Sequence, residues 1–254
     1  MNRSRQTACA TVDKPNNQAH RQPPMKTLES TTDVRGGCSV QRFVGRHCVA
    51  TLILGDCRDV LPLEADAVVT DPPYGMDWNF SGQGSGRNAQ GGTNSVTKGQ
   101  RIQGDAEDFD PTHLLQYERV IIWGMHHFPN RLQRGSVLVW VKKYPDAYGT
   151  FLSDADLAWM KGGCGVYVSK TMNPAKYQAE KCHPTQKPVP LMAWCIEKTK
   201  LPKGSTILDP YMGSGTTGLA AIRLGMNFIG IERDAAHYKT ACDRIAHELD
   251  GALL

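Results

Sequence analysis

The chain has 254 residues, of which 40% are hydrophobic, and a formal net charge of +4. This length suits one α/β domain with a recognition insert, and the hydrophobic share is enough to bury a core. No apolar run approaches the length of a membrane-spanning helix, so we expect no membrane partner. The mildly basic balance permits a nucleic-acid partner without requiring one.

The eight cysteines are scattered along the chain and form no Cys-x-x-Cys pair. A disulfide framework is typical of small secreted chains, so these residues predict reduced thiols in a cytoplasmic protein. Cys182 and His183 are adjacent soft ligands, but no partners stand at the spacing of a zinc site. We therefore interpret this pair as structural and expect no metal.

Short apolar runs dominate the chain after its first residues. Residues 1–47 are polar and unpatterned, so they predict a disordered tail ahead of a folded domain over 48–254. The apolar runs lie at 50–56, 65–73, 119–124, 136–143, 205–210 and 227–234. Because they are continuous rather than alternating, they predict parallel strands buried on both faces.

Helical patterns lie between the later strands. They cover 188–200, which opens with Pro188, 216–226, which starts on a glycine-rich loop, and 235–254. Strands alternating with helices predict an α/β fold with a doubly wound, mostly parallel sheet.

Two segments fall outside this alternation. Residues 77–104 are rich in Gly, Asn, Ser and Gln, and a loop this long inside a compact domain is usually functional or disordered. Residues 144–182 interleave lysines with tyrosines, which suits contacts to phosphates and packing on bases or sugars. An ordinary solvated surface explains this second composition equally well.

A glycine-rich loop follows the strand predicted at 205–210. Gly213, Gly215 and Gly218 stand between that strand and the next helix, and Glu232 ends the following strand. An acid about 20 residues beyond such a loop can accept hydrogen bonds from the two hydroxyls of a ribose. The loop therefore predicts a site for an adenosine-containing ligand rather than a plain tight turn.

The residues around these glycines discriminate between two such ligands. A nicotinamide dinucleotide presents a pyrophosphate to the helix N-terminus, where Asp209, beside Pro210, would repel it. The Asp209 carboxylate could instead accept from the α-ammonium of a methionine moiety. Thr216 and Thr217 could bind the methionine carboxylate through free N–H groups of the first helical turn. These residues favour S-adenosylmethionine, and a nicotinamide-dependent oxidoreductase stays a remote alternative.

The sequence Asp71-Pro72-Pro73-Tyr74 ends the run at 65–73. Its two prolines fix φ and remove two N–H donors, which leaves nearby carbonyls as acceptors. A rigid turn capped by Asp71 is one interpretation. In the other, the Asp71 carboxylate and the Pro72 carbonyl hold the N–H protons of an aryl amine, whose lone pair then faces a methyl donor. A base reaches such a loop only when flipped out of the duplex, and Tyr74 offers a ring for it to stack on.

Three motifs occur together in the order of one family. Asp71-Pro72-Pro73-Tyr74 precedes His183-Pro-Thr-Gln-Lys-Pro188, which precedes Asp209-Pro-Tyr-Met-Gly-Ser-Gly-Thr-Thr217. In this order the chain resembles the permuted β-group of DNA amino-methyltransferases, whose catalytic motif precedes the cofactor motif. The resemblance covers roughly residues 49 to 245.

The resemblance implies a Rossmann-like methyltransferase fold with circularly permuted motifs, and S-adenosylmethionine as the cofactor. It assigns Asp56 to the adenine end of the cofactor, and it assigns Thr185 and Lys187 to the motif that completes the cofactor pocket. It implies base recognition within 144–182. That segment is short, so the loop 77–104 is expected to share the contacts to DNA.

The resemblance further implies a site-specific enzyme that methylates double-stranded DNA, of the kind found in restriction-modification, as a monomer or homodimer. Asp rather than Ser at position 71 resembles the adenine-N6 enzymes more than the cytosine-N4 enzymes. Either oxygen can accept the hydrogen bond, so a cytosine-N4 enzyme is the alternative. A DNA-binding module without catalysis is another. An oxidoreductase would leave the motifs at 71–74 and 183–188 without a role.

Overall fold

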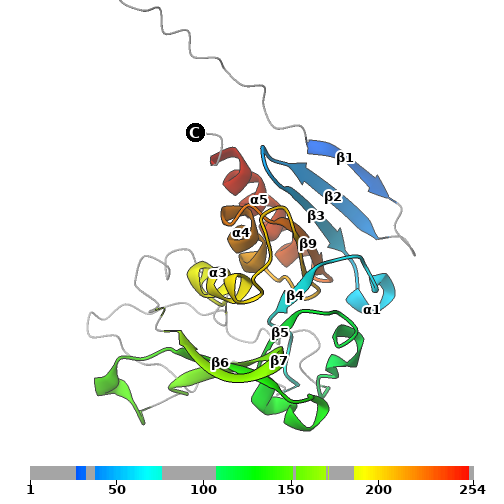
Figure 1. The fold of residues 1–254 in the computed structure, drawn as a ribbon. Coiled ribbons are helices and arrows are strands. Elements are labelled where there is room, and N and C mark those ends of the chain that lie inside the picture. The colour runs from blue at the N-terminus through cyan, green and yellow to red at the C-terminus, as the bar shows by residue number, and fades with distance from the viewer. Residues whose placement is uncertain are drawn as a thin grey trace, which may run out of the picture.

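The computed structural model describes residues 27–32, 38–75, 107–150, 153–169, 171 and 186–251. These residues form a nine-stranded sheet with the order β1-β2-β3-β9-β8-β4-β5-β7-β6 (Figure 1). The loop 77–104, Thr185, and residues 151–152, 170 and 172–182 of the predicted recognition segment lie outside the described residues, so the structure does not test their predicted roles.

Five parallel strands form the centre of the sheet. They are β3 (Val49–Leu54), β9 (Asn227–Glu232), β8 (Thr206–Asp209), β4 (Ala67–Thr70) and β5 (Val120–Trp123). Every residue of β4 and β5 is buried, as expected of strands covered on both faces. The predicted α/β fold is confirmed, and each of these strands overlaps a predicted apolar run.

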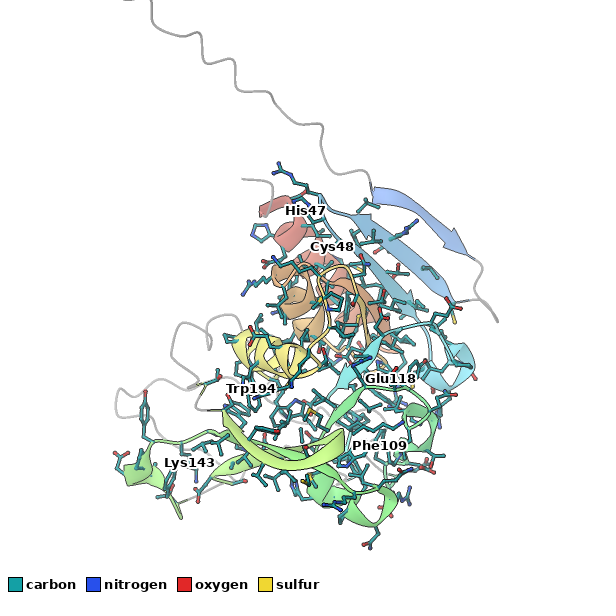
Figure 2. The ribbon with its side chains drawn as sticks, in the orientation of Figure 1. His47, Cys48, Phe109, Glu118, Lys143 and Trp194 are labelled. Carbon is teal, nitrogen blue, oxygen red and sulfur yellow. The ribbon has the colours of Figure 1, made fainter. Side chains whose placement is uncertain are left out.

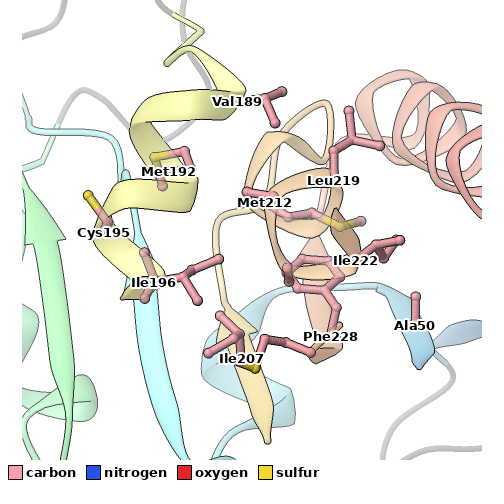
Figure 3. Close-up of a cluster of buried hydrophobic side chains, with 14 of the residues drawn as sticks. Ala50, Val189, Met192, Cys195, Ile196, Ile207, Met212, Leu219, Ile222 and Phe228 are labelled. Carbon is pink, nitrogen blue, oxygen red and sulfur yellow. The ribbon is translucent and has the colours of Figure 1, made fainter. Parts of the chain in front are cut away.

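Three helices pack side by side on one face of the sheet (Figure 1). They are α3 (Val189–Lys198), α4 (Thr216–Arg223) and α5 (Ala235–Gly251). Met192, Leu219 and Phe228 belong to the hydrophobic cluster between these helices and the sheet (Figure 3). A Cβ at Gly218 would come within 2.7 Å of Phe228, so α4 approaches β9 more closely than a larger residue would permit.

Shorter elements cover the opposite face. They are α1 (Cys57–Val60) and η1 (Pro111–Leu114), and the loops beyond β5 and β6 carry η2 (Met125–His127), η3 (Pro129–Arg131) and η4 (Pro145–Ala147). Val60, Leu114 and Phe109 join a second hydrophobic cluster on this face (Figure 2 labels Phe109). The sheet is therefore enclosed on both faces, with long helices on one of them.

Two strands extend the sheet beyond β3, where the tail was predicted. They are β1 (Thr27–Thr32) and β2 (Ser39–Val44); β2 pairs antiparallel with β3 from Ser39↔Leu54 to Val44↔Val49. Val40 and Phe43 of β2 are buried. The predicted tail of residues 1–47 is therefore wrong for these strands. Two buried apolar side chains are too few to produce a periodic signal, and pairing with β3 supplies the rest of the stabilisation.

The other edge of the sheet is an antiparallel unit of β6 (Gly135–Val141) and β7 (Ala155–Ser169). Leu138 aligns both with Ala158 in the first half of β7 and with Tyr167 in the second, so β6 lies between the two halves. Buried and half-buried side chains alternate along β6. The prediction of a parallel strand buried on both faces at 136–143 is therefore wrong, because an almost wholly apolar run conceals the alternation.

Six cysteines are free thiols in the described ranges, while Cys9 and Cys182 lie outside them. Within the same ranges, no group of three or more His, Cys, Asp and Glu side chains is arranged to hold a metal ion. No helix in the described part of the chain combines the length and apolarity needed to cross a membrane.

Candidate active site

The carboxyl ends of the five parallel strands meet along one edge of the sheet. In spatial order this edge presents Asp56 after β3, Glu232 on β9, Asp209 on β8, Asp71 after β4 and Gly124 after β5. The chain continues from β8 to β9 on one side and from β4 to β5 on the other, so the strand order reverses between β8 and β4. Ligands of open α/β sheets bind at such a switch point. The two predicted motif loops therefore flank the position where a ligand is expected.

Asp209 links the two strands at the switch point. Its buried carboxylate accepts hydrogen bonds from Thr70 Oγ1 at 2.6 Å, Thr217 Oγ1 at 2.5 Å and the Tyr211 amide at 3.1 Å. Burial raises the pKa of Asp209 to about 6, although these three donors oppose the shift. Asp209 is 2% exposed and its side chain accepts three internal hydrogen bonds, so it fastens the glycine loop to β4. This arrangement favours a structural role, and the predicted contact between Asp209 and a ligand ammonium stays untested.

The glycine loop turns directly into α4. Gly215 has φ of 82°, a left-handed conformation that favours glycine, and it precedes Thr216 without a side-chain cap. Pro210 and Thr216 are buried, and the Thr216 hydroxyl has no hydrogen-bond partner among the described residues. Buried hydroxyls are normally paired, so this orphaned atom indicates where a ligand acceptor would bind. The first N–H groups of α4 point to the same end of the helix.

Glu232 connects the end of β9 to the glycine loop. Its Oε2 accepts from the Gly213 amide at 2.9 Å and its Oε1 accepts from the Asp234 amide at 2.8 Å. A carboxylate has about four acceptor positions, so about two remain, which equals the number of hydroxyls on a ribose. The structure brings Glu232 and the loop together, and the contact with ribose stays a prediction.

Asp56 lies one strand further along the edge and caps α1. Its Oδ1 accepts from the Arg58 amide at 2.9 Å, and its Oδ2 lies 2.6 Å from the Arg58 guanidinium. This hydrogen-bonded ion pair holds the pKa of Asp56 below its usual range. The Gly55 amide donates to the Glu232 carbonyl at 2.9 Å, so Asp56 and Glu232 end neighbouring strands. The predicted contact of Asp56 with the adenine end of a cofactor is untested by these bonds.

Asp71 is at the centre of a network at the end of β4. Lys187 Nζ lies 3.0 Å from each Asp71 oxygen and 3.1 Å from the Tyr74 hydroxyl, which itself donates to Asp71. Burial alone would lower the pKa of Lys187, but the neighbouring charges, led by Asp71, raise it. Lys187 is therefore a cation held on the Asp71 carboxylate. The resemblance assigns Lys187 to the motif that completes the cofactor pocket. The structure places it against Asp71 and Tyr74, and its contact with a cofactor stays untested.

The Asp71 carboxylate can accept one more hydrogen bond in addition to those from Lys187 and Tyr74. Lys187 and Tyr74 occupy three of the roughly four acceptor positions of this carboxylate. Pro72 is buried and Pro73 is half-buried, and no residue in the described ranges donates to the Pro72 carbonyl. The loop can thus offer two acceptors at once, one from Asp71 and one from Pro72.

The ring of Tyr74 is packed from two directions. It stacks on His127 with centroids 4.9 Å apart and planes inclined by 14°. It also lies against Gly124, where a Cβ would come within 2.1 Å of a ring carbon and where φ is 80°. Burial, followed by the Asp71 charge, raises the pKa of the Tyr74 hydroxyl, so it remains a donor. Stacking on His127 reduces the ring surface that the predicted base platform could use.

Four residues near this network were missed at the level of sequence: Gly124, His127, Lys142 and Asp156. Asp156 Oδ2 lies 3.6 Å from Lys187 Nζ, and Asp156 Oδ1 lies 2.7 Å from Lys142 Nζ. Gly124 and His127 follow β5, whereas Lys142 directly follows β6 and Asp156 belongs to β7. The glycine directly after a buried strand, at RVIIWG, was the one available signal; the others belong to no recognisable motif.

Residues 140–243 match the family model N6_N4_Mtase, described as DNA methylase. The Type II methyltransferase M2.DpnII of Streptococcus pneumoniae is 49% identical over 67 residues, which are 26% of this chain and 24% of that protein. The Type II methyltransferase M.HinfI of Haemophilus influenzae is 41% identical over 68 residues, 27% of this chain and 19% of that protein. The aligned segments thus span a quarter or less of these curated relatives.

The fold is similar to a solved structure as well. The crystal structure of M1.HpyAVI superimposes with a TM-score of 0.50 at 19% sequence identity, and the match covers 77% of this chain and 98% of that chain. This likeness agrees with the α/β fold.

Proposed function

We propose that this chain is an S-adenosylmethionine-dependent DNA methyltransferase of the β-group, which methylates the N6 amino group of adenine in double-stranded DNA. The observation that carries the proposal is the pairing of two loops across the switch point. One loop holds the Asp71 carboxylate in place with an acceptor position to spare. The other loop leads to the unpaired Thr216 hydroxyl and is bound by Glu232 at the end of β9, which keeps two acceptor positions. The match of residues 140–243 to a DNA methylase family and the names of the relatives support the same activity.

The residues along the edge fit S-adenosylmethionine. Thr216 and the first turn of α4 would bind the methionine carboxylate, and the two spare acceptor positions of Glu232 would take the ribose hydroxyls. Arg58 donates three hydrogen bonds to the Asp56 carboxylate, which leaves about one acceptor position free. Asp56 would accept a hydrogen bond from the adenine amino group of the cofactor at this position. The cofactor supplies an electrophilic methyl group when bound.

The loop at 71–74 would prepare the target amine for that methyl group. An aryl amine is a poor nucleophile because its lone pair is delocalised into the ring. The spare position of Asp71 and the Pro72 carbonyl would accept its two N–H groups and thereby favour a pyramidal nitrogen. Lys187 and Tyr74 hold the Asp71 carboxylate in place while this happens. The surplus proton of the methylated amine would then pass along its hydrogen bond to the Asp71 carboxylate and from there to water, since the Asp71 side chain is 25% exposed.

DNA would enter with its target base flipped out of the duplex, since a stacked base cannot reach the end of β4. Tyr74, backed by His127, provides aromatic surface for the flipped base. Contacts to the rest of the DNA are proposed for the loop 77–104 and the segment 144–182, with the protein acting as a monomer or homodimer.

The test is to incubate the protein with unmethylated DNA and labelled S-adenosylmethionine, digest the DNA to nucleosides, and identify the modified base by mass. N6-methyladenine is the expected product. N4-methylcytosine would mean that the target base is cytosine rather than adenine. A digest without modified nucleosides would reject both activities.

A further inference from the structure

The network around Asp71 continues away from the expected position of the substrate. Lys187 Nζ lies between two carboxylates, at 3.0 Å from Asp71 and at 3.6 Å from Asp156. Asp156 in turn lies 2.7 Å from Lys142. The result is a row of alternating charges, Asp71–Lys187–Asp156–Lys142, whose two anions and two cations balance.

The row is buried unevenly. The side chain of Lys187 is 7% exposed, whereas those of Asp71, Asp156 and Lys142 are 25%, 23% and 27% exposed. A cation as deeply buried as Lys187 depends on both flanking anions, because water cannot replace either of them. The position of Lys187 between Asp71 and Asp156 is therefore a balance of two attractions.

We propose that Asp156, held by Lys142, is a positioning residue that sets how closely Lys187 binds the Asp71 carboxylate during methyl transfer. The inference rests on the proposed function for its kinetic consequence. Asp156 pulls Lys187 away from Asp71, which keeps the Asp71 carboxylate a strong acceptor for the target amine. Without the Asp156 charge, Lys187 would be drawn onto Asp71 alone, and the unpaired Lys142 ammonium would repel Lys187 in the same direction.

The chain offers a matched control in the neighbouring pair of Lys143 and Asp154. Lys143 Nζ lies 2.8 Å from Asp154 Oδ1, and the Asp154 side chain is 42% exposed. Lys143 lies one position from Lys142, and Asp154 lies two positions from Asp156. Both residues of the control pair lie in the connection between β6 and β7, where Figure 2 labels Lys143. Asp154→Asn therefore removes a similar Lys–Asp contact beside the same strands without touching Lys187.

The first measurement is the ¹⁵N–¹H resonance of the Lys187 ammonium in ¹⁵N-lysine-labelled protein, assigned by its loss in Lys187→Arg. Asp156→Asn should shift this resonance, and Asp154→Asn should leave it unchanged. If Asp156→Asn does not fold, Lys142→Met serves instead, because it leaves Asp156 free to attract Lys187 more strongly and should also shift the resonance. A Lys187 resonance that neither variant moves would overturn the proposal. This measurement needs no DNA, so it tests the positioning of Lys187 even if the protein does not methylate DNA.

The second measurement is single-turnover methyl transfer to DNA. Asp156→Asn should lower the rate roughly tenfold, which corresponds to about 1.4 kcal/mol, with cofactor affinity unchanged. Asp156→Glu should recover part of the rate. In a Lys187→Met background, Asp156→Asn should have less than about a twofold effect, because Asp156 acts through Lys187. An equal loss in both backgrounds would mean that Asp156 merely supports the fold. An inactive wild-type protein would reject the proposed function and leave the ammonium resonance to decide the positioning.

Discussion

Replacing Asp209 by Asn distinguishes a buried structural carboxylate from one that binds a ligand. Asn has nearly the same shape as Asp, and its amide oxygen can accept from Thr70 and from the Tyr211 amide. Its amide nitrogen can donate to Thr217, whose hydroxyl can act as donor or acceptor. Asp209→Asn is therefore expected to fold and to bind S-adenosylmethionine with nearly wild-type affinity.

The size of the stability effect follows from the burial of the charge. Burial raises the pKa of Asp209 from 3.8 to about 6, so the folded state retains a proton that the unfolded chain has already released at pH 5. A raised carboxyl pKa gives stability that is present at low pH and is lost as pH rises through about 6. The shift corresponds to roughly 3 kcal/mol in total, of which about 1 kcal/mol falls between pH 5 and pH 7.

The assay is urea denaturation of the wild type, Asp209→Asn and Asp209→Ala at pH 5 and pH 7. All three proteins share their other titratable groups, so the difference between wild type and the Asn variant isolates Asp209. On going from pH 7 to pH 5, the wild type should gain about 1 kcal/mol in unfolding free energy relative to the Asn variant. Asp209→Ala should lose about 2–4 kcal/mol at pH 7, because three donors then lack an acceptor. An Asn variant with wild-type stability and no cofactor binding would refute the structural role of Asp209.

Two further substitutions test the neighbouring residues. Gly124→Ala should reduce stability by about 1–3 kcal/mol and strongly slow methyl transfer, because a Cβ would displace the Tyr74 ring that supports Asp71. Gly149→Ala is the control, because Gly149 also has positive φ but has no atoms within 4 Å of its Cβ position. If both variants lose the same activity, the effect of Gly124→Ala comes from backbone conformation and not from displacement of the Tyr74 ring. Glu232→Ala should weaken cofactor binding measured by calorimetry by roughly 10–100-fold, through the loss of charged hydrogen bonds to the ribose. The half-buried acid Glu248, paired with Arg223, provides the matched Ala variant. Equal affinities in the two variants would contradict the ribose assignment.

The central strands could be predicted from the sequence because burial on both faces makes them continuous apolar runs. At the edges of the sheet, β1, β2 and β7 escaped prediction, whereas β6 was predicted as a strand but with a parallel orientation. In β2, Val40 and Phe43 are the buried apolar residues, and the strand forms because β3 is available for pairing. In the second half of β7, Val166, Tyr167 and Val168 are exposed, so no hydrophobic pattern indicates a strand with one face in the core.

The candidate site was predictable where its residues directly follow parallel strands. Asp71, Glu232 and the glycine loop stand at strand ends, so the topology alone brings them to one edge. The pairing of Lys187 with Asp71 spans 116 positions and depends on how the loop before α3 meets the end of β4. The contact of Asp156 with Lys142 depends on the register of β6 with β7. No local pattern encodes either contact, and the same holds for the internal bonds that make Asp209 structural.

The most direct test of the account compares methyl transfer by the wild type and by Asp71→Ala at equal cofactor occupancy. Calorimetry first establishes that both bind S-adenosylmethionine, and labelled cofactor with unmethylated DNA then reports the product nucleoside by mass. We expect N6-methyladenine from the wild type, none from Asp71→Ala, and similar cofactor affinity for the two proteins. Transfer that persists without the Asp71 carboxylate, or cofactor binding lost together with it, would contradict the account.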